Sequence, residues 1–156
     1  MEPSPRRADE SAVVLAQQML PTDANPQGDV HGGAIMKMVD TAGALAAMRH
    51  ARSRVVTVVM DSMTFQQPVH VGDLVHVSGR LTWTGRTSME VVVSVEAEDV
   101  VRGTRRRTSD AFLVYVALDD RSQPRPVPPL LVETPEERAL WRAAEVRREA
   151  RLRARG

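Results

Sequence analysis

The sequence contains no cysteine among its 156 residues. Without thiols the chain can form no disulfide, no zinc site with thiolate ligands and no cysteine nucleophile. The absence also suits a reducing compartment, where disulfides are rare. Lysine is nearly missing as well, because Lys37 is the only one and every other basic residue is arginine. A catalytic nucleophile in this chain therefore has to be a group other than a thiol.

Long apolar runs and a strong net charge are missing too. No segment approaches the roughly 20 apolar residues that span a bilayer, and the first ten residues are polar and acidic, unlike a secretory signal. The formal net charge is only +1, so no strong field favours nucleic acid or a membrane surface. We therefore expect a cytoplasmic protein with neither nucleic acid nor a membrane as its partner.

Residue patterns predict an α+β fold with one long helix and an antiparallel sheet. After Gly32 and Gly33, apolar residues recur at helical spacing as far as residue 47, and only Lys37 and Asp40 interrupt them with charge. A helix that is apolar nearly all round is expected to be buried. Alternating apolar and polar residues in the later strands predict a sheet with one wet face. The strands are predicted at 12–19, 55–65, 74–83, 88–98 and 107–118.

The chain divides into a flexible tail at 1–11, a single domain at 12–131 and a helical extension at 132–156. Thr134 and Glu137 predict a capping box at the start of the last helix. One copy of the sheet would leave its edges and the outer side of the central helix open. A second copy would cover both, so the pattern favours a homodimer.

A glycine pair stands where the central helix begins. Gly32 and Gly33 lack Cβ atoms, so a ligand can come close to the backbone. The first helical turn also has free N–H groups and the positive end of the helix dipole. Those groups can hold the oxyanion of a tetrahedral intermediate. The alternative is that the glycines only allow tight packing at the helix entry.

Asp40 lies within the otherwise apolar helix. A buried carboxylate without a partner is costly, so Asp40 needs either a partner or a chemical role. As a general base it could activate a water molecule. The alternative is an ion pair with Arg49, with Arg52 or with a neighbouring subunit.

Two further residues lie just before the helix. Asn25, in a loop dense in turn formers, could donate an amide hydrogen bond to a substrate carbonyl or to the attacking water, although turn asparagines are usually structural. His31 is more typical of a helix cap than of a catalyst. The other histidines have no spacing that suggests a metal site, and no Gly-x-Ser-x-Gly motif marks a serine nucleophile.

The segment Asn-x-x-Gly-Asp-Val-His-Gly-Gly at 25–33, followed by Ile-Met-x-x-x-Asp at 35–40, resembles the signature of hotdog-fold acyl-CoA thioesterases. It is most similar to the branch of the bacterial YciA-type enzymes and the mammalian brain-type cytosolic acyl-CoA hydrolases. The resemblance extends over about residues 12–130. Further matches follow in register at 56–58, 61–65, 71–73, 85–89 and 112–119.

The resemblance implies a sheet wrapped around a long helix and an enzyme that hydrolyses acyl-CoA to the free acid and coenzyme A. It implies that Asp40 is the catalytic carboxylate and that Asn25 assists it, with the two residues of each site coming from different subunits. It also implies a trimer of dimers, and no metal or cofactor beyond the coenzyme A of substrate and product. A turn that matches a loop near coenzyme A consists of Gly85, Arg86, Thr87 and Ser88.

In the expected reaction the acyl carbonyl lies against the helix N-terminus at Gly33. Asp40 deprotonates a water, which attacks the carbonyl and expels CoA thiolate. Direct attack by the carboxylate, through an anhydride, is equally compatible with the sequence. Two other functions are also compatible: an acyl-thioester hydratase or dehydratase that uses His31 with Asp40, and a non-catalytic acyl-CoA sensor. A regulator of the second kind would need a DNA-binding element, and the sequence shows no helix-turn-helix.

Overall fold

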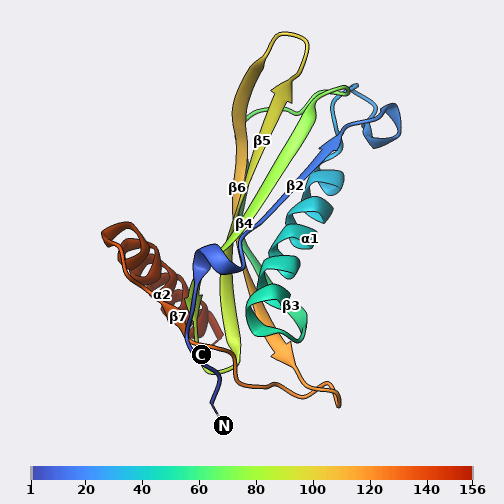
Figure 1. Ribbon diagram of the computed structural model, residues 1–156. Helices are drawn as coiled ribbons and strands as arrows, with labels where there is room; N and C mark the ends of the chain where they lie inside the picture. The colour runs from blue at the N-terminus through green and yellow to red at the C-terminus, as the bar shows by residue number, and fades with distance from the viewer. Residues whose placement is uncertain (1, 156) are drawn as a thin grey trace.

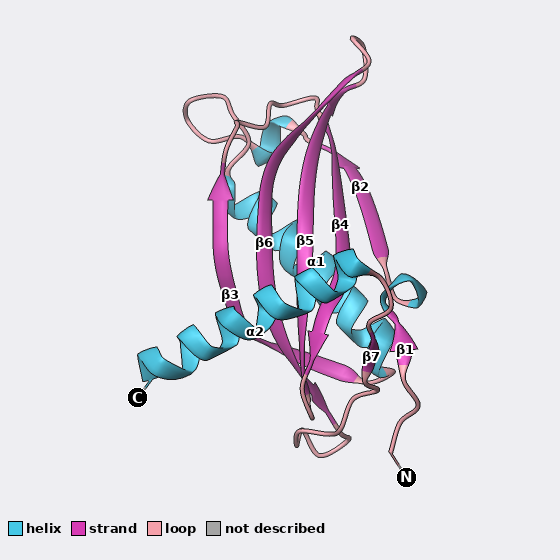
Figure 2. Ribbon diagram, turned by 90° about the vertical axis from the view of Figure 1, so that its left-hand side faces the viewer, coloured by secondary structure: helices cyan, strands magenta, loops and turns pink. Residues whose placement is uncertain are grey.

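The computed structural model describes residues 2–155, with the side chain of Ser62 excepted. Its main feature is a five-stranded antiparallel sheet in the order β2-β4-β5-β6-β3 (Figures 1 and 2). All five predicted strands are confirmed, with small shifts at their ends. The strands are β2 (Val13–Gln18), β3 (Arg54–Phe65), β4 (Leu74–Thr84), β5 (Ser88–Asp99) and β6 (Thr104–Leu118).

Helix α1 (Gly32–Ala51) packs against one face of the sheet and contacts all five strands. Val39 and Ala42, on its sheet-facing side, are fully buried. Met36 and Leu45, on the two flanks of that side, are 42% and 37% exposed, and Lys37 and Thr41 beyond them are exposed as well. The expectation of a helix buried all round is therefore wrong for the single chain, because only one side of α1 meets the sheet. Within residues 2–155 no helix is both long enough and apolar enough to cross a membrane.

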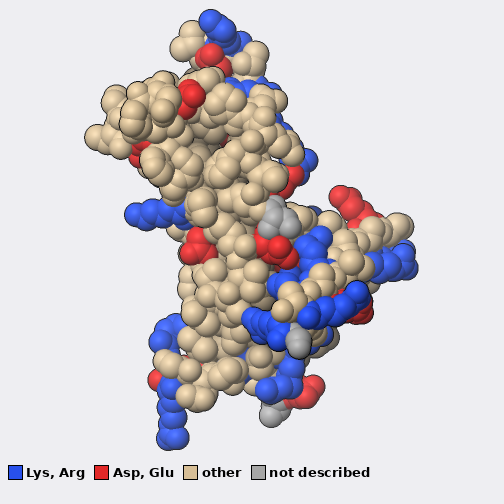
Figure 3. Space-filling view, turned by 180° about the vertical axis from the view of Figure 1, so that it is seen from behind, with Lys and Arg blue, Asp and Glu red and all other residues tan. Residues whose placement is uncertain are grey.

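Helix α2 (Pro135–Arg155) crosses the opposite face of the sheet (Figure 2), and arginine side chains gather over it (Figure 3). The Glu137 N–H donates to Thr134 Oγ1 at 3.1 Å and the Thr134 N–H donates to Glu137 Oε1 at 3.0 Å, so the predicted capping box is confirmed. The helix also covers Glu90, which strand alternation places on the wet face. Glu90 is 1% exposed and pairs with Arg147 at 2.7 Å. The outer face is therefore wet only where α2 does not lie over it.

The N-terminal residues are held by a late segment of the chain. Arg6–Arg7 form β1, which pairs in parallel with β7 (Leu130–Leu131), and the Arg6 N–H donates to the Pro129 carbonyl at 2.9 Å. A short 3-10 turn, η1 (Ala8–Glu10), follows, and its Ala8 is 1% exposed. Residues 6–11 thus differ from the loose tail expected for 1–11, because Arg6 and Arg7 pair with β7, Ala8 is buried and the Ser11 N–H donates to the Ala8 carbonyl.

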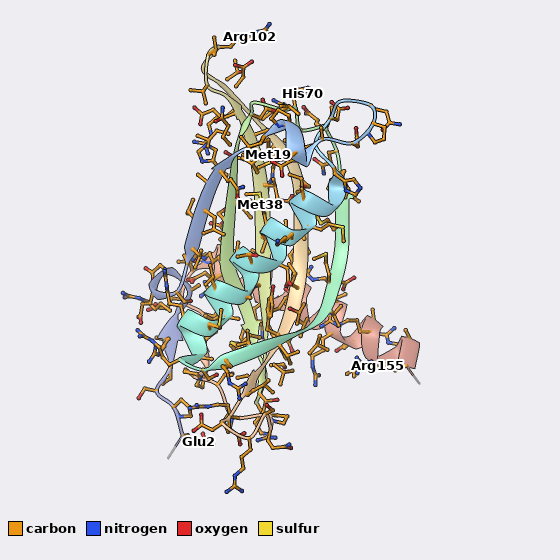
Figure 4. The ribbon with its side chains drawn as sticks, turned by 90° about the vertical axis from the view of Figure 1, so that its right-hand side faces the viewer. Glu2, Met19, Met38, His70, Arg102 and Arg155 are labelled. Atoms are coloured by element: carbon orange, nitrogen blue, oxygen red, sulfur yellow. The ribbon has the colours of Figure 1, made fainter. Side chains whose placement is uncertain are left out.

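Strand β3 forms an open edge of the sheet within the described chain. Its pairing with β6 shifts register in two places, and its Val56 and Val58 are each 45% exposed. The C-terminal end of α2, marked by Arg155 in Figure 4, extends past this edge in Figures 2 and 4. An open apolar edge is a surface with which a second chain can pair.

Candidate active site

The carboxylate of Asp40 lies on α1 between two hydroxyl groups of the sheet. Thr57 of β3 donates from Oγ1 to Asp40 Oδ1 at 2.9 Å, and Tyr115 of β6 donates from its hydroxyl to the same oxygen at 2.9 Å. Oδ2 has no partner among the described residues. One carboxylate oxygen is therefore held in place, and the other is left able to accept a proton.

No cation neutralises this carboxylate in the part of the chain that the structure describes. The proposed alternative, an ion pair of Asp40 with Arg49 or Arg52, is not formed, and Arg49 instead donates to the Ala12 carbonyl at 2.7 Å. Residues 2–155, Ser62 apart, also contain no group of three or more acidic or histidine side chains that could hold a metal ion. A half-buried carboxylate with hydroxyl partners and no permanent counter-ion is suited to proton transfer.

Asn25 lies in the loop before α1, and that loop holds its side-chain oxygen. Oδ1 accepts the N–H groups of Gln27 at 3.0 Å and of Asp29 at 3.2 Å. Gly28 allows the turn through a φ of 91°, which side-chain-bearing residues rarely adopt. Because both partners of Oδ1 are N–H donors, the amide NH₂ is left to bind another acceptor. This geometry suits the predicted role of Asn25 as a donor to a carbonyl or to water.

His31 caps the first turn of α1, as the sequence favours. Its Nδ1 accepts the Gly33 N–H at 2.9 Å. That N–H is therefore bound within the chain, and binding of the substrate carbonyl at Gly33 stays a prediction. The N–H of neighbouring Gly32 has no partner among the described residues. Gly32 also lines a cleft of about 270 Å³, together with Asn25 and Phe65.

The two parts of the expected site lie apart within one chain. Asp40 does not line the cleft that contains Asn25 and Gly32. Along α1 it is seven residues beyond Gly33, which is about 10 Å at 1.5 Å per residue. A single chain thus has a helix end that can bind a carbonyl and a carboxylate that can act on it, but the two do not meet in one cleft.

The turn from Gly85 to Ser88 joins β4 to β5 at the end of the sheet away from the Asn25 loop (Figure 1). The Gly85 N–H donates to the Ser88 carbonyl at 2.8 Å, and the Val127 N–H donates to the Arg86 carbonyl at 2.9 Å. The backbone of the turn is thus well held, while the Arg86 residue is exposed. An exposed guanidinium on a rigid turn can meet an anionic ligand.

A second cleft, of about 370 Å³, lies between α1 and β2. Leu15, Met19, Ala34 and Met38 form much of its apolar lining, and Figure 4 labels the two methionines. Apolar clefts of this size can bury a hydrocarbon chain.

A family model described as the Thioesterase superfamily matches residues 27–104. The chain belongs to this superfamily. This thioesterase-superfamily chain is 38% identical over 142 residues to the uncharacterized acyl-CoA thioester hydrolase YkhA of Bacillus subtilis, covering 91% of the chain and 83% of that protein. It is 39% identical over 119 residues to acyl-CoA thioester hydrolase YciA of Salmonella typhimurium, with 74% and 90% covered. The cytosolic acyl coenzyme A thioester hydrolase of Mus musculus is 35% identical over 140 residues, which cover 88% of this chain but only 37% of that longer protein.

Solved structures agree with the family assignment. The crystal structure of an apo hexameric acyl-CoA thioesterase matches with a TM-score of 0.93 and 37% identity, covering 98% of both chains. The acyl-CoA hydrolase of Staphylococcus aureus, solved with butyryl coenzyme A, coenzyme A and coenzyme A disulfide, matches with a TM-score of 0.88 and 33% identity, covering 96% of this chain and 92% of that one. The expected hotdog fold of this thioesterase-superfamily chain is confirmed.

Alanine mutants of the same S. aureus hydrolase have been solved, and they change an aspartate, an asparagine and a threonine. In that protein the asparagine precedes the aspartate by 15 positions and the threonine follows it by 17. Asn25, Asp40 and Thr57 have the same spacing in this chain. The sequence pattern alone did not single out Thr57, although a hydroxyl within a run of valines was an available signal.

Proposed function

We propose that this protein hydrolyses acyl-CoA thioesters to free acids and coenzyme A. The observation that carries the proposal is the Asp40 carboxylate, which Thr57 and Tyr115 hold through one oxygen while the other stays open. Such a group can take the proton of an attacking water. The relatives named acyl-CoA thioester hydrolase, at 35–39% identity, support the substrate class.

In the proposed reaction the acyl carbonyl oxygen accepts hydrogen bonds from the Gly32 N–H and the Asn25 amide of one subunit. Asp40 of a second subunit takes a proton from a water molecule through Oδ2, while the oxygen of this water bonds to the carbonyl carbon. The helix N-terminus and the amide stabilise the resulting oxyanion. The carbonyl then re-forms as the carbon–sulfur bond breaks, and coenzyme A leaves as its thiolate.

Attack of Oδ2 on the carbonyl carbon, through a mixed anhydride, is the second route. Single-turnover hydrolysis in isotopically labelled water detects an anhydride that opens at the Asp40 carboxyl group. Water attack places labelled oxygen in the first acid released. An anhydride that opens at the Asp40 carboxyl group instead leaves that first acid unlabelled.

The proposed assembly is a homodimer joined along β3, in which Asn25 of one copy meets Asp40 of the other. The separation of these residues within one chain supports it, as do the exposed Val56 and Val58. Three such dimers would form a hexamer, which the solved hexameric relatives support. We place the protein in the cytoplasm, by analogy with its cytosolic relative from mouse.

Coenzyme A recognition is proposed at the turn from Gly85 to Ser88, with Arg86 near a phosphate of the substrate. A guanidinium binds phosphate oxygens through paired N–H donors, so charge and geometry both suit this pairing. The coenzyme A arrives with the substrate and leaves as product, and the reaction as written needs no other cofactor.

Thiol release from acyl-CoA substrates of graded chain length tests the proposed function. Asp40→Asn keeps the size of the side chain but removes the proton acceptor, so we expect kcat to fall by about 10²- to 10⁴-fold. Asp120→Asn, at an exposed position in the turn after β6, is the matched control and should keep full activity. Full activity in Asp40→Asn would exclude the carboxylate mechanism. Hydration of an enoyl-CoA without thiol release would indicate a hydratase, and tight acyl-CoA binding without turnover would indicate a sensor.

A further inference from the structure

The only tyrosine of the chain is buried beneath Asp40. Tyr115 is 0% exposed, and its hydroxyl lies 2.9 Å from Asp40 Oδ1 and 3.1 Å from the Asp40 backbone oxygen. Because none of its surface reaches solvent, Tyr115 cannot touch a substrate. Any effect of this residue on the reaction must therefore pass through Asp40.

Gly43 provides the space for the tyrosine hydroxyl. It lies three residues after Asp40, on the same side of α1. A Cβ atom at position 43 would collide with the Tyr115 hydroxyl oxygen and would come within 3.1 Å of two ring atoms. Glycine weakens the interior of a helix, so its presence in the middle of α1 needs a reason such as this close approach.

The Tyr115 hydroxyl is a lasting hydrogen-bond donor. Burial raises the pKa of Tyr115 far above its ordinary value, and the charge and hydrogen bond of Asp40 raise it further. The phenol therefore keeps its proton throughout the range in which the protein works. Thr57 donates to the same oxygen of Asp40. Rotation of the carboxylate would break both bonds, so the pair of donors fixes its orientation.

We propose that Tyr115, seated against Gly43, is a positioning residue that holds the Asp40 carboxylate with Oδ2 free for the reaction. This inference rests on the proposed role of Asp40 in thioester hydrolysis. It adds a residue that acts from inside the core and a glycine that makes room for it.

Tyr115→Phe tests the inference, because it removes a single oxygen atom. We expect kcat for thiol release to fall by about 10- to 100-fold, the range for losing a hydrogen bond to a charged group. KM should change by less than about two-fold, because the substrate does not contact the ring. A purely structural role would lower the melting temperature while leaving kcat per folded site unchanged.

Gly43→Ala provides the second arm of the experiment. Its methyl group displaces the hydroxyl, so kcat should fall in this variant as well. In a Tyr115→Phe background the same change should lower kcat little further, because the hydrogen bond to Asp40 is already absent and only the two ring contacts at 3.1 Å are left. The double variant should therefore match Tyr115→Phe alone, whereas independent effects would multiply.

Gly79→Ala is the matched control for crowding on α1. A Cβ at position 79 would lie 3.0 Å from the Ala42 carbonyl oxygen, which places it against the same helix but away from the Tyr115 hydroxyl. Any loss of kcat in Gly79→Ala should therefore be the same in the wild-type background and in the Tyr115→Phe background. If Tyr115→Phe removed the loss of kcat caused by Gly43→Ala and also the loss caused by Gly79→Ala, its effect would be a general loosening of the core. That result would overturn the inference.

The failures of the inference and of the proposed function differ in their results. Unchanged kcat in Tyr115→Phe, with Asp40→Asn inactive, overturns the positioning role alone. Full activity in Asp40→Asn removes the proposed function itself. Should Tyr115→Phe fail to fold, Gly43→Ala decides the matter, since full activity in that folded variant overturns the inference.

Discussion

Thr57 and Tyr115 both direct a hydroxyl hydrogen at Oδ1 of Asp40. A carboxylate that has lost part of its water on a half-buried helix needs such donors, because burial without them is costly. A guanidinium in their place would hold the group permanently in its ionised form and make proton uptake harder. Two neutral donors therefore keep the carboxylate stable and still able to react.

Thr57→Val tests the second donor at this residue scale. Valine has a similar shape and suits a strand, and position 57 is exposed at the sheet edge, so the fold should be unchanged. We expect kcat at saturating acyl-CoA to fall by about ten-fold. Thr104→Val, at the exposed start of β6, is the control. Equal kcat in the Thr57 variant and in the wild-type protein would remove Thr57 from the site.

At the scale of elements, α2 decides which outward-facing strand positions become buried. Arg147 donates from Nε to Glu90 Oε2 at 2.9 Å and from Nη2 to Oε1 at 2.7 Å. Thr82 donates to Oε1 at 2.6 Å, and the guanidinium of Arg147 lies 3.6 Å from the centre of the Phe112 ring. Ala144 of the same helix is 1% exposed. The helix thus docks through a buried ion pair as well as through apolar contact.

Arg147→Met would leave Glu90 buried without its cation. Removing one partner of a buried ion pair costs about 3–5 kcal/mol. We expect a loss of this size in the free energy of unfolding, measured in urea at a fixed protein concentration. Adding Glu90→Gln should restore most of the loss, because a neutral amide needs no counter-ion. Arg142→Met, at an exposed position of the same helix, is the control, and an equal loss there would contradict the role of the ion pair.

At the scale of the whole molecule, the proposed site requires two copies of the chain. The Asn25 cleft and the Asp40 carboxylate belong to separate stretches of α1 and its preceding loop. The turn from Gly85 to Ser88 lies at the other end of the sheet (Figure 1). An antiparallel pairing of two β3 strands would place the loop end of one copy beside the turn end of the other. Such a pairing would let all three features meet around one substrate.

Asn25→Ala removes the amide donor to the carbonyl, so we expect it to lose most of its kcat, as Asp40→Asn does. Mixing these two variants tests whether each site is shared. In a dimer of one Asn25→Ala chain and one Asp40→Asn chain, one shared site keeps both residues and the other loses both. Oligomers reassembled from equal amounts of the two variants should therefore release thiol at about a quarter of the wild-type rate, because about half of their dimers are mixed and each mixed dimer has one intact site. Inactive mixed dimers that remain assembled would place Asn25 and Asp40 of each site in the same chain.

Much of the fold could be predicted because its signals are local. Period-two alternation in β4, β5 and β6, helical spacing in α1 and the Thr134 capping box all act within a few residues. The role of His31 as a helix cap was likewise predictable from its place before the helix. The signature around Asn25 and Asp40 indicated the family, which the superfamily match and the related hydrolases confirm.

Residue order alone predicted the helices and strands, the family and the need of Asp40 for a partner or a role. The folded chain was needed to show that hydroxyl groups are the partners, that Arg147 pairs with the buried Glu90 and that the Gly33 N–H donates to His31. The contacts of Asp40 and of Glu90 join residues that lie far apart in the sequence, and local patterns do not predict such contacts. Periodicity and capping act between near neighbours, whereas Tyr115 reaches Asp40 across 75 residues, after the strand order has placed β6 under α1.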